Sequence, residues 1–291
     1  MQATGSSFLG GLLLSWGRSP RGSAHLTVVR SAPDNPLLVM WRRRNTTNVG
    51  TWRPHVSSDM HSILKHGAIT ACEYVPWGSN YTFCVDLQFE GRACRGIYKP
   101  RRGERPLWDF PDGTLYRREY AAFVTSQALR WALVPPTVIR QGPHGVGSMQ
   151  LFVDSEPPRS MRDLLSADDL SLARIAAFDI VTNNADRKAG HVLRDADGQL
   201  WAIDHGLCFN VPPKVRTVLL HFCQSPVPES ILTDLASFRA DPFRVDGWSS
   251  LLYGVLSHEE MDMFLRRTDW VIEHRVYPSL DPYSGVPWPP F

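Results

Sequence analysis

The sequence has few cysteines, little net charge and no apolar run long enough to span a membrane. Its five cysteines are odd in number and contain no CxxC pair, and the formal net charge is +2. We therefore expect no disulfide framework and a reducing, cytoplasmic location. The small charge predicts no nucleic-acid partner. No amphipathic membrane-binding helix or cysteine-rich palmitoylation stretch is evident, so we also expect no stable membrane anchor.

The cysteines raise one further possibility, which is a zinc site. Its ligands would be His205, Cys208, His221 and Cys223. Their spacing fits no common structural zinc motif, so this interpretation is not favoured.

The composition is that of a globular protein, with 43% hydrophobic and 21% charged residues. A chain of 291 residues is long enough for one large domain or for two lobes. Residues 1–65 are rich in Ser, Gly, Arg and Asn, and we expect a disordered N-terminal extension there. We divide the rest into a first lobe at 66–154, a second lobe at 155–280 and an extended C-terminal tail at 281–291. The sequence gives no expectation about oligomeric state.

The first lobe is predicted to be a small sheet with one helix. A helix is expected from Leu115 to Trp131, where apolar residues roughly trace one helical face. Apolar or alternating segments predict strands at Ala68–Val75, Tyr81–Phe89, Cys94–Lys99, Val134–Arg140 and Ser148–Asp154.

The second lobe is predicted to be mostly helical, with a single hairpin. Helices are expected at Asp168–Thr182, Pro228–Arg239 and Ser257–His274, the last beginning with a capping box of Ser257 and Glu260. After the first of these helices, a turn at Asp195–Gly198 between two apolar segments predicts a tight β-hairpin.

Two carboxylates flank this hairpin. Asp186 precedes it in Asn-Asn-Ala-Asp-Arg-Lys, and Asp204 follows it in Ala-Ile-Asp-His-Gly. A hairpin brings its two ends together, so we expect both carboxylates at the mouth of one pocket. Phosphoryl transfer from a metal-bound nucleotide needs such a pair, one to orient the attacking hydroxyl and one to hold the cation. Taken alone, Asp186 would be typical of a capping or turn residue. Gly206 follows Asp204 by two residues. A glycine there permits the positive φ, or the close approach of the backbone, that a metal-binding turn often needs.

Lys99 and Glu119 are the candidates for holding phosphates. Lys99 ends the third predicted strand, from which a lysine can reach the phosphates of a nucleotide. Glu119 lies on the following helix and can pair with that lysine. The alternatives are a solvated basic cluster that continues into Arg101, Arg102 and Arg105, and a surface glutamate with a helical partner.

Two further segments are candidates for nucleotide binding. Gly78-Ser79-Asn80, between the first two strands, can cover phosphates with backbone N–H groups, although a plain hairpin turn fits equally well. Gln150-Leu151-Phe152-Val153 would connect the lobes and offer backbone groups to an adenine, or it is simply a buried edge strand.

In this order, the motifs resemble the phosphatidylinositol 3-/4-kinase-like branch of the protein-kinase-like fold, most closely bacterial members related to type II phosphatidylinositol 4-kinases. The matching segments are Ile97–Pro106, Arg118–Ala122, Asn184–Arg187 and Ala202–Phe209, and the resemblance covers about residues 66–275. Toxin-type HipA kinases share the Asn-x-Asp-Arg part. The resemblance implies an α+β, bilobal kinase-like fold, with a small antiparallel-sheet N-lobe carrying one helix and a mostly helical C-lobe.

The resemblance also implies roles for individual residues. Lys99 would bind the α and β phosphates of ATP, and Asp186 would be the catalytic-loop aspartate. Asp204 would hold Mg²⁺ or Mn²⁺, and the segment 150–153 would be the hinge. Lys188 stands where the family often has His, and we expect it to neutralise charge on the moving phosphoryl group.

His191 departs from the family pattern, which has a metal-binding asparagine at this position. Imidazole is a poor ligand for Mg²⁺, which prefers oxygen. Four explanations stay open: Asn183 or Asn184 completes the metal site, Mn²⁺ is tolerated, a single metal binds, or activity is weak.

We expect a kinase that transfers the γ-phosphoryl group of ATP to a hydroxyl of an unidentified protein, lipid or small molecule. Because no membrane-binding feature is evident, a soluble protein or small molecule is the favoured acceptor. The alternative is a nucleotide-binding pseudokinase or regulatory protein without phosphotransfer. A third hypothesis is transfer of another part of the nucleotide, such as AMP.

Overall fold

The computed structural model describes residues 6–9, 12–18, 24–26 and 58–290, apart from 77–79, 157, 159, 166–168 and 241–247. The chain divides into two compact units, residues 1–45 and 46–291. In the first unit, β1 (Ser6–Leu9), β2 (Leu12–Arg18) and β3 (Ala24–Leu26) form an antiparallel sheet. Every predicted site residue lies in the second unit.

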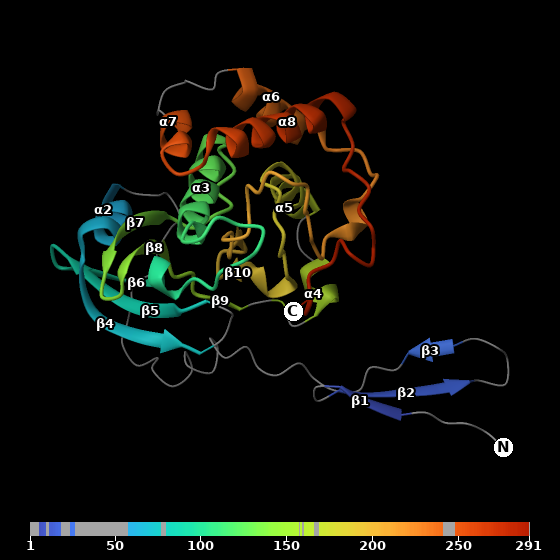
Figure 1. The fold of residues 1–291 in the computed structure, drawn as a ribbon, viewed down its shortest axis with the longest axis horizontal. Coiled ribbons are helices and arrows are strands. Elements are labelled where there is room, and N and C mark those ends of the chain that lie inside the picture. Colours follow the sequence, from blue (N-terminus) through green and yellow to red (C-terminus); the bar gives the residue numbers. More distant parts are fainter. Residues whose placement is uncertain are drawn as a thin grey trace. The chain divides into compact units, whose positions relative to one another are not determined.

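The first lobe of the second unit is a five-stranded antiparallel sheet with strand order β4-β5-β6-β8-β7 (Figure 1). Its strands are β4 (Ala68–Val75), β5 (Thr82–Phe89), β6 (Arg92–Pro100), β7 (Thr137–Gly142) and β8 (Gly145–Leu151). All five strands were predicted. The fourth begins at Thr137 instead of Val134, because Pro135 and Pro136 lack the N–H groups that a strand ladder needs.

Two helices accompany this sheet, where the sequence predicts one. Helix α3 (Leu115–Ala128) is the predicted helix, and it ends three residues earlier than expected because the chain becomes left-handed at Arg130, with φ 57°. Helix α2 (Ser58–His66) begins inside the segment for which we expected disorder. Its Ile63 and Leu64 are buried in the apolar core of the sheet.

The second lobe is mostly helical, as predicted. Its helices are α4 (Met161–Leu165), α5 (Asp169–Val181), α6 (Glu229–Ala240), α7 (Trp248–Tyr253) and α8 (His258–His274). The predicted capping box is present, since Ser257 and Glu260 each accept the other's backbone N–H. The short elements α4, α7 and β9 (Ser155–Glu156) were not predicted. None of the helices among the described residues has the length and apolarity needed to cross a membrane.

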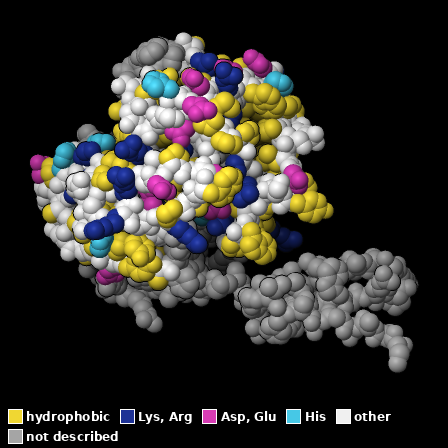
Figure 2. Space-filling view, in the orientation of Figure 1, with side chains coloured by type: hydrophobic (Ala, Val, Ile, Leu, Met, Phe, Trp, Pro, Cys, Tyr) yellow, Lys and Arg dark blue, Asp and Glu magenta, His cyan; other side chains and the backbone are white. Residues whose placement is uncertain are grey.

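Helix α3 belongs to both lobes, and this fixes where Glu119 lies. Apolar residues of α3 join the core of the second lobe. The buried Arg118 donates to the Cys208 carbonyl oxygen at 2.6 Å and forms an ion pair with Glu260 of α8. The described elements therefore form the predicted α+β arrangement of two lobes, with α3 anchored on the helical lobe. On the face drawn in Figure 2, Lys and Arg side chains lie in small groups among acidic and apolar ones.

Candidate active site

The hairpin predicted between the two carboxylates is present. Strands β10 (Val192–Asp195) and β11 (Leu200–Ala202) pair antiparallel. Beyond the last strand pair, the Ile203 N–H donates to the His191 carbonyl at 2.9 Å, so the pairing continues to the residue before Asp204. Asp204 is left-handed, with φ 60°. The expected positive φ therefore falls on Asp204 itself rather than on Gly206, and aspartate is among the residues that tolerate it best.

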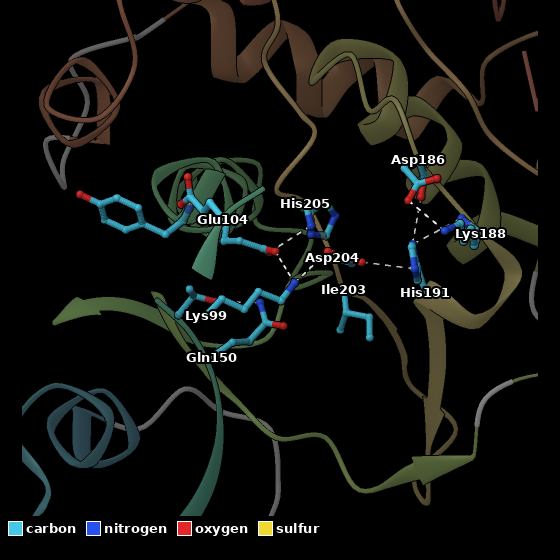
Figure 3. A network of polar contacts seen from close by, with 12 residues as sticks. Lys99, Glu104, Gln150, Asp186, Lys188, His191, Ile203, Asp204 and His205 are labelled. Atoms are coloured by element: carbon cyan, nitrogen blue, oxygen red, sulfur yellow. Dashed lines mark hydrogen bonds and ion pairs between the residues drawn. The ribbon is translucent and has the colours of Figure 1, made fainter. Parts of the chain in front are cut away.

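The Lys99 ammonium group contacts both Glu119 and Asp204. Its Nζ lies 2.5 Å from Glu119 Oε1. It lies 2.8 Å from Asp204 Oδ1, and this contact is drawn in Figure 3. The second oxygen of Glu119 accepts the backbone N–H of His205 at 3.0 Å. Burial lowers the pKa of Lys99, but the Asp204 and Glu119 carboxylates outweigh it and hold the pKa above its ordinary value. Strand β6, helix α3 and the end of the hairpin therefore meet at Lys99, whose raised pKa keeps its side chain positively charged.

Asp186 and Lys188 lie together on the loop after α5. The Lys188 Nζ is 3.2 Å from Asp186 Oδ2, and both side chains are partly exposed. Burial raises the pKa of Asp186, Lys188 lowers it and the nearby Asp204 raises it, and the net shift is upward. A carboxylate with a raised pKa is better suited to receive a proton than an ordinary surface aspartate.

His191 connects the two aspartates (Figure 3). Its Nδ1 lies 2.9 Å from the backbone carbonyl of Asp186, and its Nε2 lies 3.4 Å from Asp204 Oδ2. Burial lowers the pKa of His191 to about 4, so the imidazole is neutral near pH 7. Its contacts therefore place the Asp204 carboxylate beside the loop that carries Asp186.

A buried ion pair supports the loop that carries Asp186. Arg187 and Asp179 both have 0% side-chain exposure, and the guanidinium binds the carboxylate through Nε and Nη2 at 2.9–3.1 Å. Arg187 also donates to the Ile203 carbonyl at 2.8 Å and lies 2.8 Å from His205 Nε2. One side chain thus joins α5, the Asp186 loop and the Asp204 turn. Our sequence analysis missed Asp179, although an acidic residue within the apolar stretch 175–181 was a usable signal.

Asn184 requires a correction, because the structure removes it from the candidate metal ligands. Its side chain is fully buried, its Nδ2 donates to Asp179 at 2.8 Å, and its Oδ1 accepts the Asp186 N–H at 3.0 Å. Its oxygen is therefore used to shape the loop. Asn183 is likewise a scaffold residue, because its Oδ1 accepts the Lys214 N–H at 2.7 Å and its Nδ2 donates to the carbonyls of Asn210 and Pro212.

The predicted phosphate loop is described only in part. Gly78 and Ser79 lie outside the described residues. The Asn80 Oδ1 accepts the backbone N–H of Arg105 at 2.7 Å. Asn80 therefore links the β4–β5 connection to the loop that follows Lys99, and its side-chain oxygen is used for that contact.

The predicted hinge lies at the end of β8, next to the strand that carries Lys99. Gln150 is 7% exposed and donates from Nε2 to Thr137 Oγ1 at 2.9 Å. The N–H groups of Leu151 and Phe152 donate to the carbonyls of Pro136 and Arg95. Both donors are therefore already used within the chain, so an adenine at this place would meet carbonyl groups or Val153.

The loop between β6 and α3 contacts the segment that follows Asp204. Asp109 forms an ion pair with Lys214, and its carbonyl accepts from Asn210 Nδ2 at 2.8 Å. Glu104 accepts the N–H groups of Leu115 and Tyr116 and so caps the start of α3. A cavity of about 140 Å³ lies in this loop, and its lining includes Arg101 and Arg105.

A metal ion at this site would depend on ligands from outside the chain. Among the described residues, no group of three or more His, Cys, Asp or Glu side chains is arranged to hold one. Asp204 offers a carboxylate and His191 an imidazole, which fits a cation that also binds nucleotide phosphates. The five cysteines all lie among the described residues, and no disulfide joins any of them.

Comparison with known proteins finds one relative along most of the chain. Protein Rv2133c from Mycobacterium tuberculosis is 37% identical over 268 residues, which cover 80% of this chain and 96% of that protein. Phosphatidylinositol 4-kinase gamma 4 from Oryza sativa subsp. japonica is 38% identical over 85 residues, 26% of this chain and 15% of the plant protein. The chain matches no family model.

Several solved kinase structures follow a similar path. The Golgi casein kinase has a TM-score of 0.49 at 15% identity, covering 77% of this chain and 75% of that chain. The Helicobacter pylori proinflammatory kinase CtkA has a TM-score of 0.45 at 12% identity, covering 72% of this chain and 94% of that chain. Identities this low carry no information about activity.

Proposed function

Since the chain belongs to the family that includes Protein Rv2133c of Mycobacterium tuberculosis, a name that states no activity, its function has to follow from its site, and we propose that it is an ATP-dependent kinase. The observation that carries this proposal is the contact of Lys99 with both Glu119 and Asp204. A strand lysine paired to a helix glutamate, beside a cation-binding aspartate, is the arrangement with which kinases hold a triphosphate.

Each charged residue then has a separate task. Lys99 binds the phosphates, and Glu119 holds its ammonium group in place. Asp204 holds the divalent cation, Mg²⁺ or Mn²⁺, which neutralises phosphate charge when it is bound. Lys188 lies 3.2 Å from the Asp186 carboxylate, where its charge stabilises the phosphoryl group during transfer.

Asp186 orients the hydroxyl of the acceptor. The hydroxyl oxygen forms a bond to the γ-phosphorus, the bond from that phosphorus to the β–γ bridging oxygen breaks, and ADP leaves. The hydroxyl proton passes to the Asp186 carboxylate. Because the transition state of phosphoryl transfer is loose, positioning contributes more than the strength of this base.

Asp186→Asn provides the test of this proposal. Purified protein with ATP and Mg²⁺ or Mn²⁺ should transfer phosphate, and the variant should abolish the transfer. The substitution leaves the backbone bond from Asp186 to Asn184 available, so the loop keeps its support. Asp197→Asn, at an exposed position in the hairpin turn, is the matched control and should leave activity unchanged. Equal activity of wild type and Asp186→Asn would remove Asp186 from this role.

The acceptor is proposed to be a soluble protein or a small molecule. The partial match to a phosphatidylinositol 4-kinase makes inositol lipid the rival substrate. Incubation with γ-labelled ATP, in parallel with cell extract and with phosphoinositide vesicles, separates the two. Label in the extract alone supports our proposal, whereas label in the vesicles alone supports the lipid.

A pseudokinase is the second candidate function, and His191 is the observation that favours it. In the sequence pattern that the chain resembles, this position is a metal-binding asparagine. A pseudokinase would be stabilised by ATP against thermal unfolding without any turnover. Phosphotransfer that depends on Asp186 would exclude it, and product mass would distinguish phosphoryl transfer from transfer of AMP.

A further inference from the structure

The two nitrogens of the His191 ring have different surroundings. The Nδ1 lies 2.9 Å from the Asp186 carbonyl oxygen, which only accepts hydrogen bonds. The Lys188 N–H approaches the same nitrogen at 3.4 Å, a longer and weaker contact. A hydrogen on Nδ1 satisfies the shorter of these two contacts. Nε2 is then the nitrogen whose lone pair is open to a cation.

Nε2 faces the oxygen of the Asp204 carboxylate that Lys99 does not contact. Lys99 contacts Oδ1 of Asp204, whereas His191 Nε2 lies 3.4 Å from Oδ2. Adjacent donors on a six-coordinate ion with bonds of about 2.1 Å are roughly 3 Å apart. The Oδ2 and Nε2 atoms are thus spaced as two neighbouring ligands of one cation. The Asp186 carbonyl holds the ring in this orientation, as outer partners commonly do for metal-binding histidines.

We propose that His191 and Asp204 form a mixed nitrogen and oxygen site that binds Mn²⁺ in preference to Mg²⁺. This inference rests on the proposed nucleotide-binding function and specifies its cation. Mg²⁺ prefers oxygen ligands and gives up its water reluctantly, whereas imidazole suits transition metals. The remaining ligands are nucleotide phosphates and water, and an oxygen-rich octahedral shell of this kind suits Mn²⁺ among those metals.

The direct test is pulsed electron paramagnetic resonance of Mn²⁺ bound with a non-hydrolysable ATP analogue. Wild-type protein should show coupling of the metal to an imidazole nitrogen, and His191→Asn should lose it. Because adenine also contains nitrogen, the His191→Asn spectrum supplies the baseline for the comparison. His221→Asn is the matched control, since His221 is exposed and belongs to the 3₁₀ helix Leu220–Phe222, outside the site. A wild-type spectrum without imidazole coupling would overturn the proposal.

Metal affinities give a second, independent readout. In the presence of the analogue, the ratio of the Mg²⁺ to the Mn²⁺ dissociation constant should fall about tenfold in His191→Asn, because an amide oxygen replaces the imidazole. An unchanged ratio would also overturn the proposal. Neither measurement needs turnover. Imidazole coupling in a protein that transfers no phosphate would therefore uphold this site and refute the kinase, whereas a lack of nucleotide-dependent Mn²⁺ binding would refute both.

Discussion

Asp179 and Arg187 form an ion pair that is closed to solvent on both sides. Neither side chain is exposed, and the guanidinium contacts both carboxylate oxygens, with Nε 3.0 Å from Oδ2 and Nη2 2.9 Å from Oδ1. Arg187 directly follows Asp186, and Asp179 lies in α5. The position of Asp186 therefore depends on an adjacent charge pair that is itself fully buried.

We expect Asp179→Asn to lower the free energy of unfolding by about 3–5 kcal/mol, because it leaves a buried arginine without its counter-charge. Urea or thermal denaturation measures this loss. Asp269→Asn is the matched control, since it breaks the Arg239–Asp269 pair, whose side chains are 30% and 39% exposed. An exposed pair of this kind contributes about 0–1 kcal/mol. Similar losses in the two variants would contradict a special role for the buried pair.

A second prediction concerns the link from Glu119 to Lys99. Glu119→Gln should weaken the binding of an ATP analogue by about 10- to 100-fold, because a hydrogen bond to a charged group contributes about 1.5–3 kcal/mol. Titration calorimetry measures the affinity. Glu273→Gln, at an exposed position near the end of α8, should bind the analogue as the wild type does. Unchanged affinity in Glu119→Gln would show that Lys99 binds the nucleotide equally well without the Glu119 carboxylate.

A third prediction follows from the raised pKa of Asp186. The aspartate acts in its ionised form, so the rate should fall as the pH decreases through this pKa, above the ordinary range of aspartate. Lys188 lowers the pKa of Asp186. Its removal in Lys188→Met should raise that pKa further and shift the acid limb of the kcat/KM profile to higher pH. Lys188→Arg keeps the charge and should leave the limb in place. If the acid limb kept its position in Lys188→Met, the assignment of this limb to Asp186 would be wrong.

Sequence reasoning succeeded where the contacts are local. The turn at Asp195–Gly198 and its flanking apolar segments define the hairpin, and the hairpin alone brings Asp204 to His191. The Ser257 cap of α8 is also local, since its partner is three residues away. Lys99 and Asp204, by contrast, are 105 residues apart. Only the order of the motifs along the chain predicted that these two residues lie close together.

Other features depend on tertiary contacts that no local pattern encodes. Helix α2 is a short element, and it is stabilised by burial of Ile63 and Leu64 against a sheet that follows it in the chain. The assignment of Asn184 as a metal ligand failed for a different reason. Its partners Asp179 and Asp186 are near in the sequence, but the sequence does not show that the side chain is buried and turned towards them. An asparagine beside a catalytic loop is chemically suited to either role, and only the positions of its neighbours decide between them.

The C-terminal tail provides a fourth prediction, because its backbone contacts the segment that follows Asp186 and Lys188. The Pro290 carbonyl accepts the Ala189 N–H at 2.9 Å, and the Gly285 carbonyl accepts the Thr217 N–H at 2.8 Å. Ala189 begins the 3₁₀ helix that ends at His191. The tail therefore supports the turn that places both Lys188 and His191.

Removal of residues 282–291 should lower kcat by about 10- to 100-fold, since small displacements of positioned groups cost rates of this order. The measurement is made well below the melting temperature of the truncated protein, so that loss of folded protein does not contribute. Tyr283→Ala is the control, because this side chain is 94% exposed and the tail backbone stays intact. If the truncated protein kept the wild-type kcat, the turn at Ala189 would hold without Pro290. A decrease in kcat that Tyr283→Ala does not share would instead assign the effect to the backbone contacts.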